Sequence, residues 1–216
     1  MKTPRVQREQ IVEAALALLE QDGLDGLSMR KLAQTLDMQA ASLYWHFASK
    51  QALVDAMADN LIGDVARTLQ GHHAWDEGVR MVAREFRQAL LKHRDGARVF
   101  AGTYVVTDNV LRTNEALISG FGQAGADPDT AAQLTLSLTY FVLGLVMEEQ
   151  ALGPGSTADL GARNQAFMKL ALAQYPGNWA ARNAISSVDF NERFEMGLAL
   201  LIAGVEPFLK LRKKAK

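Results

Sequence analysis

The chain has 216 residues, of which 49% are apolar and 22% are charged, and its formal net charge is −1. This composition is typical of a soluble protein with a sizeable core, and it excludes a disordered or a strongly basic chain. The chain contains no cysteine, which excludes disulfide bonds and thiolate chemistry.

The first ten residues are polar and lack the apolar run of a signal peptide. No uncharged apolar stretch reaches the roughly 18 residues that span a bilayer. The longest candidate, residues 134–147, ends at Glu148 and Glu149. We therefore expect a cytoplasmic protein that has no membrane partner.

Helical periodicity runs through almost the whole sequence and no strand-like alternation persists, which predicts an all-α fold of nine or ten helices. In the amino-terminal part, helices are expected over residues 4–21, 29–36 and 39–46. Ser49 is expected to cap a fourth helix. Apolar residues from Trp75 to Leu90 indicate a longer amphipathic helix.

The carboxy-terminal part is predicted to be helical between a few breaks. Residues 93–103 contain two glycines and are expected to form a broken helix or a hinge. The clearest loop is predicted over residues 151–163, and a helix from there to about residue 174. The other helices are expected over residues 107–122, 128–150 and 189–210.

Two short helices near the amino terminus are joined by a tight turn at Asp37 and Met38, and a preceding helix braces them. This is the helix-turn-helix plan, in which the second short helix enters the major groove of DNA. Ala40, Leu43 and Phe47 are spaced to pack inward from that helix. The opposite face is then formed by Gln39, Ser42, Trp45 and His46, with Ala41 and Tyr44 at its flanks.

The side chains of this outer face suit DNA. Glutamine can read adenine, serine can meet either base type, and alanine can approach a thymine methyl group. Tyrosine, histidine and lysine suit phosphate oxygens, which fix the register without carrying sequence information. Arg30 and Lys50 flank the face with positive charge.

The charge of this segment is an opposing observation. Residues 1–50 contain six lysines and arginines and six aspartates and glutamates, whereas a non-specific DNA binder would be basic. Affinity would therefore depend on cations placed on one face and on dimerisation. The alternative from the pattern alone is a plain helical bundle whose aromatic surface contacts a protein.

Residues 23–57 resemble the DNA-binding domain of the tetracycline-repressor (TetR) family of bacterial regulators. The most specific feature is the motif LYWH, residues 43–46, followed four residues later by Lys50. The resemblance continues, in order along the chain, through the family's effector-binding region and its two dimerisation helices, at residues 86–103, 141–150 and 194–206.

The resemblance implies an all-α protein with a helix-turn-helix DNA-binding domain, a connecting helix, and an effector-binding and dimerisation domain, at residues 1–50, 51–70 and 71–216. It implies a homodimeric repressor that covers a palindromic double-stranded DNA operator and leaves it when a small-molecule effector binds. The positions that it places against DNA are Arg30, Gln39, Ala40, Ala41, Ser42, Tyr44, Trp45, His46 and Lys50.

The family's tetracycline-binding members receive the drug as a magnesium chelate. One histidine completes the metal shell, and a second histidine and an asparagine hold the polar edge of the drug. The resemblance places Phe100, Ala66 and Val82 at these positions, so all three polar groups are missing. Phe100 has no lone pair to offer a metal.

Other positions of this region are mixed. Phe86 and Thr103 match the family, whereas Tyr104 and Val105 stand where the family has Arg-Pro. We therefore expect an apolar or aromatic effector and no metal or cofactor, since ligand sites are typically apolar with a few placed polar groups. The alternative is that the same residues fill the core of the bundle. The residues predicted to line the pocket are Val82, Phe86, Phe100, Thr103, Tyr104, Val105, Asn114, Leu117, Phe121 and Tyr140.

Two helices have matching apolar spacings of four, three and four residues, and both are apolar beyond one stripe. Two such helices from each subunit would form a four-helix dimer interface. The alternative is a helix pair buried inside one subunit. The resemblance makes Glu148 the acidic residue contributed across the dimer. The predicted interface comprises Leu134, Leu138, Phe141, Leu145, Glu148, Phe194, Leu198, Leu201 and Val205.

No catalytic residue and no metal site is predicted. His72 and His73 are adjacent, which favours a surface turn over a metal site, and Glu148 and Glu149 have no evident partner for acid–base catalysis. Three functions compete: an effector-controlled repressor, a helical small-molecule carrier or enzyme that has lost DNA binding, and an architectural DNA binder without a ligand. The intact face over residues 39–46 argues against the second, and the neutral charge argues against the third.

Overall fold

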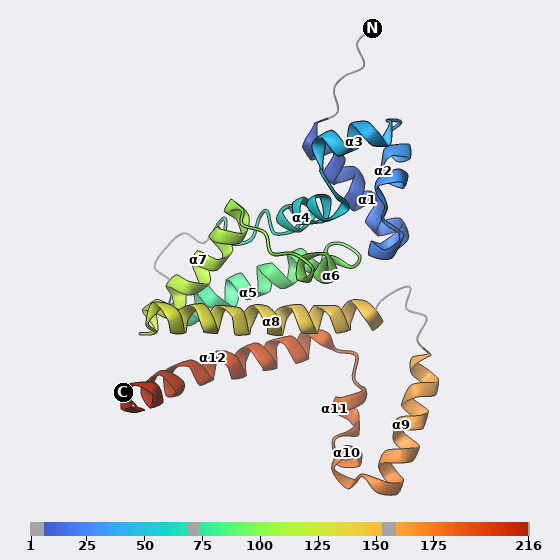
Figure 1. The fold of residues 1–216 in the computed structure, drawn as a ribbon. Coiled ribbons are helices and arrows are strands. Elements are labelled where there is room, and N and C mark those ends of the chain that lie inside the picture. The colour runs from blue at the N-terminus through green and yellow to red at the C-terminus, as the bar shows by residue number, and fades with distance from the viewer. Residues whose placement is uncertain (1–6, 69–73, 153–158, 216) are drawn as a thin grey trace.

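A computed structural model describes residues 7–68, 74–152 and 159–215 of the chain. Every regular element in these residues is an α-helix, so the all-α prediction is confirmed (Figure 1). The described part holds twelve helices, whereas nine or ten were predicted, because residues 176–186 form two short helices and residues 96–101 form one. The predicted start of the first helix, at residue 4, lies outside the described residues.

The amino-terminal head is formed by three helices, α1 (Arg8–Gly26), α2 (Met29–Thr35) and α3 (Ala40–His46). One apolar face of α1 is buried, α2 packs against α1, and α3 packs against α2. The side chain of Ser28 accepts a hydrogen bond from the backbone N–H of Lys31, which caps α2 at its predicted start. Gly23 breaks α1 with a φ of 70°, a conformation that favours glycine.

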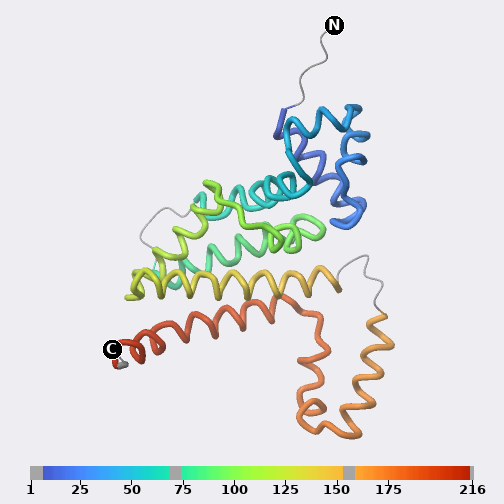
Figure 2. Tube along the Cα trace, in the orientation of Figure 1, coloured from blue at the N-terminus to red at the C-terminus, as the bar shows by residue number. Residues whose placement is uncertain are grey.

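The helix α4 (Lys50–Leu61) connects the head to the rest of the chain, and Ser49 caps it as predicted by accepting from the backbone N–H of Ala52. The body, as we call it, comprises α5 (Trp75–Leu91), α6 (Gly96–Ala101), α7 (Asp108–Gln123), α8 (Pro128–Leu152) and α12 (Phe190–Ala215). The chain trace shows α4 above the body and α8 and α12 lying side by side along it (Figure 2).

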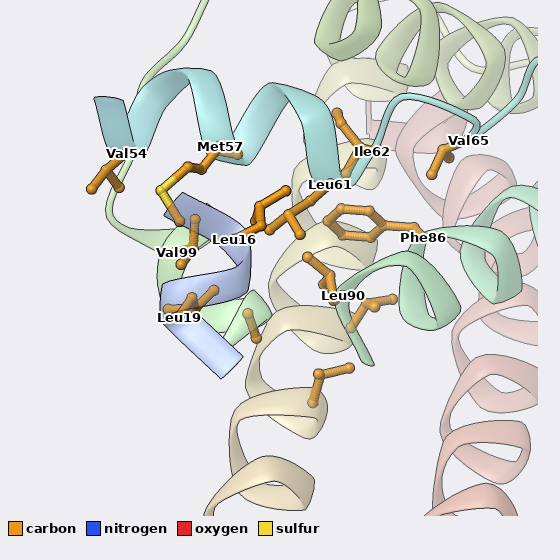
Figure 3. Close-up of a cluster of buried hydrophobic side chains, with 14 of the residues drawn as sticks. Leu16, Leu19, Val54, Met57, Leu61, Ile62, Val65, Phe86, Leu90 and Val99 are labelled. Carbon is orange, nitrogen blue, oxygen red and sulfur yellow. The ribbon is translucent and has the colours of Figure 1, made fainter. Parts of the chain in front are cut away.

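The hydrophobic core is continuous from the head through α4 into the body (Figure 3). Leu16 and Leu19 of α1 lie beside Met57 of α4, and further along the cluster Phe86 of α5 lies beside Leu61. All five are 7% exposed or less. α4 makes apolar contacts with α1 on one side and with the body on the other. The packing of the body therefore influences where the head lies.

A buried cation ties three helices of the body together. Arg87 of α5 is 4% exposed and donates two hydrogen bonds to the Glu149 carboxylate of α8, at 3.0 and 2.8 Å. It also donates to the side chain of Asn191 at 2.7 Å, and its guanidinium lies 4.9 Å from the ring centroid of Phe194. A buried charge needs such partners, because removing either the guanidinium or the carboxylate would leave the other charge buried without compensation.

The helices α9 (Leu160–Gln174), α10 (Pro176–Ala180) and α11 (Arg182–Ser186) pack on one another and project from the body as an arm (Figure 1). A loop was predicted over residues 151–163. Both ends of that range are helical, since α8 continues to Leu152 and α9 begins at Leu160. By length and composition α8 could cross a membrane, but one side of it packs against α5, α7 and α12, and 39% of its most apolar 18-residue stretch is buried.

Candidate DNA-binding surface, effector site and dimer face

The inner face of α3 is well packed, which holds the helix with its outer face at the surface. Leu43 and Phe47 are buried. The guanidinium of Arg8 lies 4.3 Å from the ring centroid of Phe47, and its Nη1 donates to the carbonyl of His46 at 3.3 Å, at the end of α3. Trp45 is 90% exposed and Tyr44 is 50% exposed. The aromatic cluster is therefore divided, with Phe47 supporting the helix and the other two rings facing solvent.

All nine predicted DNA-facing residues are accessible at the surface of the head. Ala40 and His46 are half-buried and the other seven are exposed. Lys50 begins α4, where its ammonium lies 3.4 Å from the carbonyl oxygen of Leu24. Sequence reasoning missed Arg8, whose role depends on a contact that spans 38 residues of the chain.

A polar joint, also missed, connects the end of α1 to α6 and to Asp95, the residue before it. The backbone N–H of Leu24 donates to the Asp95 carboxylate at 2.8 Å, and Arg98 donates two hydrogen bonds to Asp25, at 3.0 and 3.2 Å. The hydrogen bonds from Arg98 lower the pKa of the Asp25 carboxyl. A Cβ at Gly23 would lie 2.9 Å from an oxygen of Asp95, so this close approach requires glycine.

Of the ten predicted effector residues, four are buried, four are half-buried and two are exposed. Val82, Phe86, Leu117 and Phe121 are at most 4% exposed. The rings of Phe86 and Phe100 meet edge to face with centroids 5.1 Å apart. A ligand could reach the four buried side chains only if neighbouring side chains moved, so the alternative of plain core packing stays open for them.

Phe100, Thr103, Val105 and Asn114 are half-buried, and the hydroxyl of Thr103 donates to the carbonyl of Phe100 at 2.7 Å. The other two predicted residues face solvent. Tyr104 is fully exposed and Tyr140 is 64% exposed. The loop before α7 and the outer side of α8 carry these rings into solvent, which helical spacing does not reveal.

The structure corrects the predicted dimer interface. Phe194, Leu198 and Val205 of α12 and Leu138 of α8 are at most 3% exposed, because the two helices pack on each other within one chain. Phe141, which is half-buried, stacks on Phe194 with centroids 6.0 Å apart. For these residues, the spacing of four, three and four reflects a helix pair buried inside one subunit. This was the alternative to a dimer interface.

The remaining predicted interface residues are less enclosed. Leu134 and Leu145 are half-buried, Leu201 is 38% exposed and Glu148 is exposed. Other large apolar side chains of the same two helices are exposed, and we call them the outer face. It comprises Leu136, Tyr140 and Met147 of α8 and Met196, Leu200, Phe208 and Leu211 of α12.

In the described residues, no three histidine, cysteine, aspartate or glutamate side chains are grouped so that they could hold a metal ion. His72 and His73 lie outside the described residues, so the surface turn predicted for them stays a prediction. Glu149, which was weighed for acid–base catalysis, is occupied by Arg87.

Comparison with known protein families matches both parts of the chain. Residues 11–57 match bacterial regulatory proteins of the tetR family, and residues 68–209 match the tetracyclin repressor-like C-terminal domain. The chain therefore belongs to the TetR family, which confirms the resemblance drawn from the sequence. It is a transcriptional repressor of this family, with a helix-turn-helix DNA-binding domain and a ligand-binding C-terminal domain.

Individual relatives cover nearly the whole chain. The tetracycline repressor protein class A from transposon 1721 of Escherichia coli is 35% identical over 203 residues, covering 93% of this chain and 91% of that protein. A possible TetR family transcriptional regulator from Streptomyces coelicolor A3(2) is 40% identical, with a TM-score of 0.84 over 94% of this chain and all of the other. The Streptomyces coelicolor TetR family protein ActR in complex with actinorhodin is 30% identical, with a TM-score of 0.83 over 93% and 96% of the two chains.

Proposed function

We propose that this protein is a homodimeric repressor that covers a palindromic operator and is released by an apolar or aromatic small molecule without the help of a metal ion. The observation that carries the effector assignment is the contact between Phe86 and Phe100. It fills, with two phenyl rings, the region where the family resemblance places a metal-binding histidine.

The DNA half of the proposal is supported by α3. Its exposed face combines an amide, a hydroxyl and aromatic rings, and Leu43 and Phe47 hold it rigidly on the head. Gln39, just before α3, would read a base edge, and Lys50, at the start of α4, would meet a phosphate. Two copies of a helix-turn-helix in a symmetric dimer would read two half-sites about one helical turn of DNA apart.

The effector half is supported by the chemistry of the cluster. Magnesium requires oxygen or nitrogen ligands in near-octahedral order. Phe100 offers none, and the hydroxyl of Thr103, which donates to the carbonyl of Phe100, could supply at most one. An apolar or aromatic ligand would instead gain ring contacts with Phe86 and Phe100. The structural relative ActR is in complex with actinorhodin, which favours a small-molecule effector here as well.

The dimer is supported by the outer face of α8 and α12. Large exposed apolar patches on a protein commonly mark an interaction surface. The patch runs along two adjacent helices, and Gly144 and Gly204 leave open space where a partner helix could approach. We therefore assign the subunit contact to Leu136, Tyr140 and Met147 together with Met196, Leu200, Phe208 and Leu211, in place of the stripe that is buried within the chain. A repressor of this kind would act in the cytoplasm, without a membrane partner.

The test uses fluorescence anisotropy with DNA from the region upstream of the protein's own gene. Specific binding is expected there, and a panel of aromatic compounds is expected to contain one that releases the DNA in the presence of a metal chelator. Magnesium–tetracycline is expected to have no effect. Release by tetracycline that requires magnesium would refute the effector assignment, and failure to bind any DNA specifically would favour a carrier or an enzyme on the same fold.

A further inference from the structure

The recognition helix α3 is short, and few side chains anchor it. It is seven residues long, and a helix of that length is not stable by itself in water. Within it only Leu43 is buried, and the buried Phe47 follows at its carboxyl-terminal end. The stability and the orientation of α3 must therefore come from the contacts that its neighbours make with it.

Arg8, in the first turn of α1, makes two of these contacts. Its Nη1 donates to the carbonyl of His46 at 3.3 Å, and its guanidinium lies over the ring of Phe47 at 4.3 Å from the centroid. The last carbonyls of a helix have no partner within the helix, and a cation at that end also interacts favourably with the helix dipole. Arg8 thus caps the carboxyl-terminal end of α3. No other side chain of α1 hydrogen-bonds to α3 in the described part of the chain.

The end of α3 that Arg8 holds is the end that carries the aromatic residues assigned to DNA. Tyr44, Trp45 and His46 form its last turn, and the carbonyl bound by Arg8 belongs to His46 itself. The direction in which these three side chains project therefore depends on Arg8. Gln39 precedes the first turn and lies roughly 10 Å away along the helix, so its placement depends less on this contact.

We propose that Arg8 is a positioning residue of the DNA-binding surface, which fixes the last turn of α3 so that its side chains meet DNA in one orientation. It acts through α3 and reads no base itself. The guanidinium is required, because a planar cation can lie over a ring and direct an N–H group at a carbonyl at the same time. A lysine ammonium supplies the charge without the planar shape.

The rival role for an exposed arginine beside this surface is a plain phosphate contact. A phosphate contact depends on the charge, adds affinity for every DNA sequence alike and steepens the salt dependence. A positioning role depends on the shape of the guanidinium and affects base contacts, which need defined side-chain placement. Arg8→Lys keeps the charge and Arg8→Met keeps only the apolar body, so the two variants separate the two roles.

Hydrogen exchange on the full chain without DNA tests the contact itself. Both Arg8 variants are expected to exchange the amides of residues 44–47 about fivefold faster than the wild type, as for a lost hydrogen bond, while residues 11–19 of α1 keep their rates. Glu9→Gln, at the exposed neighbour, is the matched control and should match the wild type. Unchanged exchange over residues 44–47, or equal acceleration in α1 and α3, would overturn the positioning role.

Binding titrations at several salt concentrations test the consequence, and this part rests on the proposed function. They compare the DNA that the protein binds upstream of its own gene with a scrambled duplex of the same length. In both Arg8 variants the ratio of specific to non-specific affinity is expected to fall about fivefold per half-site, with the wild-type salt slope. Lys50→Ala is the reference for a lost phosphate contact, with a lower slope and an unchanged ratio.

Two results of the titrations would overturn the proposal. Wild-type binding by Arg8→Lys together with a lower slope for Arg8→Met would identify Arg8 as a phosphate contact. Faster exchange with an unchanged ratio would mean that Arg8 orders α3 without affecting recognition. If the wild type bound no DNA specifically, the proposed function would fail, and the exchange experiment would still decide whether Arg8 fixes the last turn of α3.

Discussion

The recognition helix α3 and the last helix α12 both leave large apolar side chains in solvent, but their surroundings differ. Trp45 and Tyr44 of α3 stand among an amide, a hydroxyl and a histidine. The outer face of α12 is a row of apolar side chains, of which Met196 and Leu200 are 60% and 69% exposed. A mixed face suits the polar and charged surface of DNA, whereas an unmixed apolar row suits a protein.

The two faces of α12 itself also differ in their exposure. Leu198 is fully buried against the body, while Leu200, two residues further on, points into solvent. Two residues of a helix are about 200° apart, so they lie on nearly opposite faces. The inner face belongs to the fold of one subunit, and the outer face is the one available to a second subunit.

The largest effect is expected from Leu198→Glu, which places a carboxylate in the inner face. An unpaired buried charge costs several kcal/mol, a large part of the stability of a domain. We expect the variant to lose its cooperative thermal transition, as measured by circular dichroism. A variant that melts at the wild-type temperature would show that α12 does not pack as described.

Leu200→Glu is expected to separate assembly from folding. The side chain is exposed within one chain, so helicity should stay at the wild-type level while light scattering shows a monomer in place of a dimer. Leu200→Met is the matched control and should remain dimeric, because it keeps the apolar contact. A stable Leu200→Glu dimer would place the subunit contact elsewhere.

The same logic applied to the head gives a smaller and more selective effect. Gln39→Ala is expected to cost roughly 1 to 3 kcal/mol at particular base pairs and to relax the preference there. Lys50→Ala should weaken binding to all sequences alike and lower the salt slope by about one per half-site. Binding titrations on single-base operator variants at several salt concentrations distinguish the two. An identical, sequence-independent loss for both variants would contradict the placement of α3.

The helices of the head and the side chains that they bury were predictable from the sequence. Ser28 and Ser49 mark helix starts, and the LYWH motif is specific. Helical spacing puts Leu43 and Phe47 on the inner face of α3, away from its outer face. Each signal is local and each helix has one buried face, so the period fixes which residues are inside.

The body was less predictable because its helices are apolar on two faces. The period of α12 shows both stripes but does not say which one is covered by its own chain, so Leu198 was assigned to the wrong contact. The joint of Asp25 with Arg98 and the hold of Arg112 on the turn after α4 depend on contacts between distant parts of the chain. Such contacts leave no spacing in the sequence.

The smallest expected effect concerns the polar edge between the two faces of α12. Arg84 donates hydrogen bonds of 2.8 and 2.7 Å to the Glu195 carboxylate, and these hydrogen bonds lower the pKa of Glu195. Both side chains are nearly half exposed, so water and salt screen the pair and its contribution to stability is at most about 1 kcal/mol.

The sign of the pH dependence follows from the direction of that shift. A carboxyl with a lowered pKa in the folded state stabilises the fold above its unfolded pKa, and this stabilisation is lost as the pH falls through the folded value. Glu195→Gln should therefore be slightly less stable than the wild type near neutral pH, and the two should converge below about pH 4. A double-mutant cycle with Arg84→Gln, measured by urea unfolding at both pH values, isolates the pair. A coupling free energy that stays constant between pH 7 and acid would mean that the pair does not form in solution, and the edge of α12 would then be set by its two apolar faces alone.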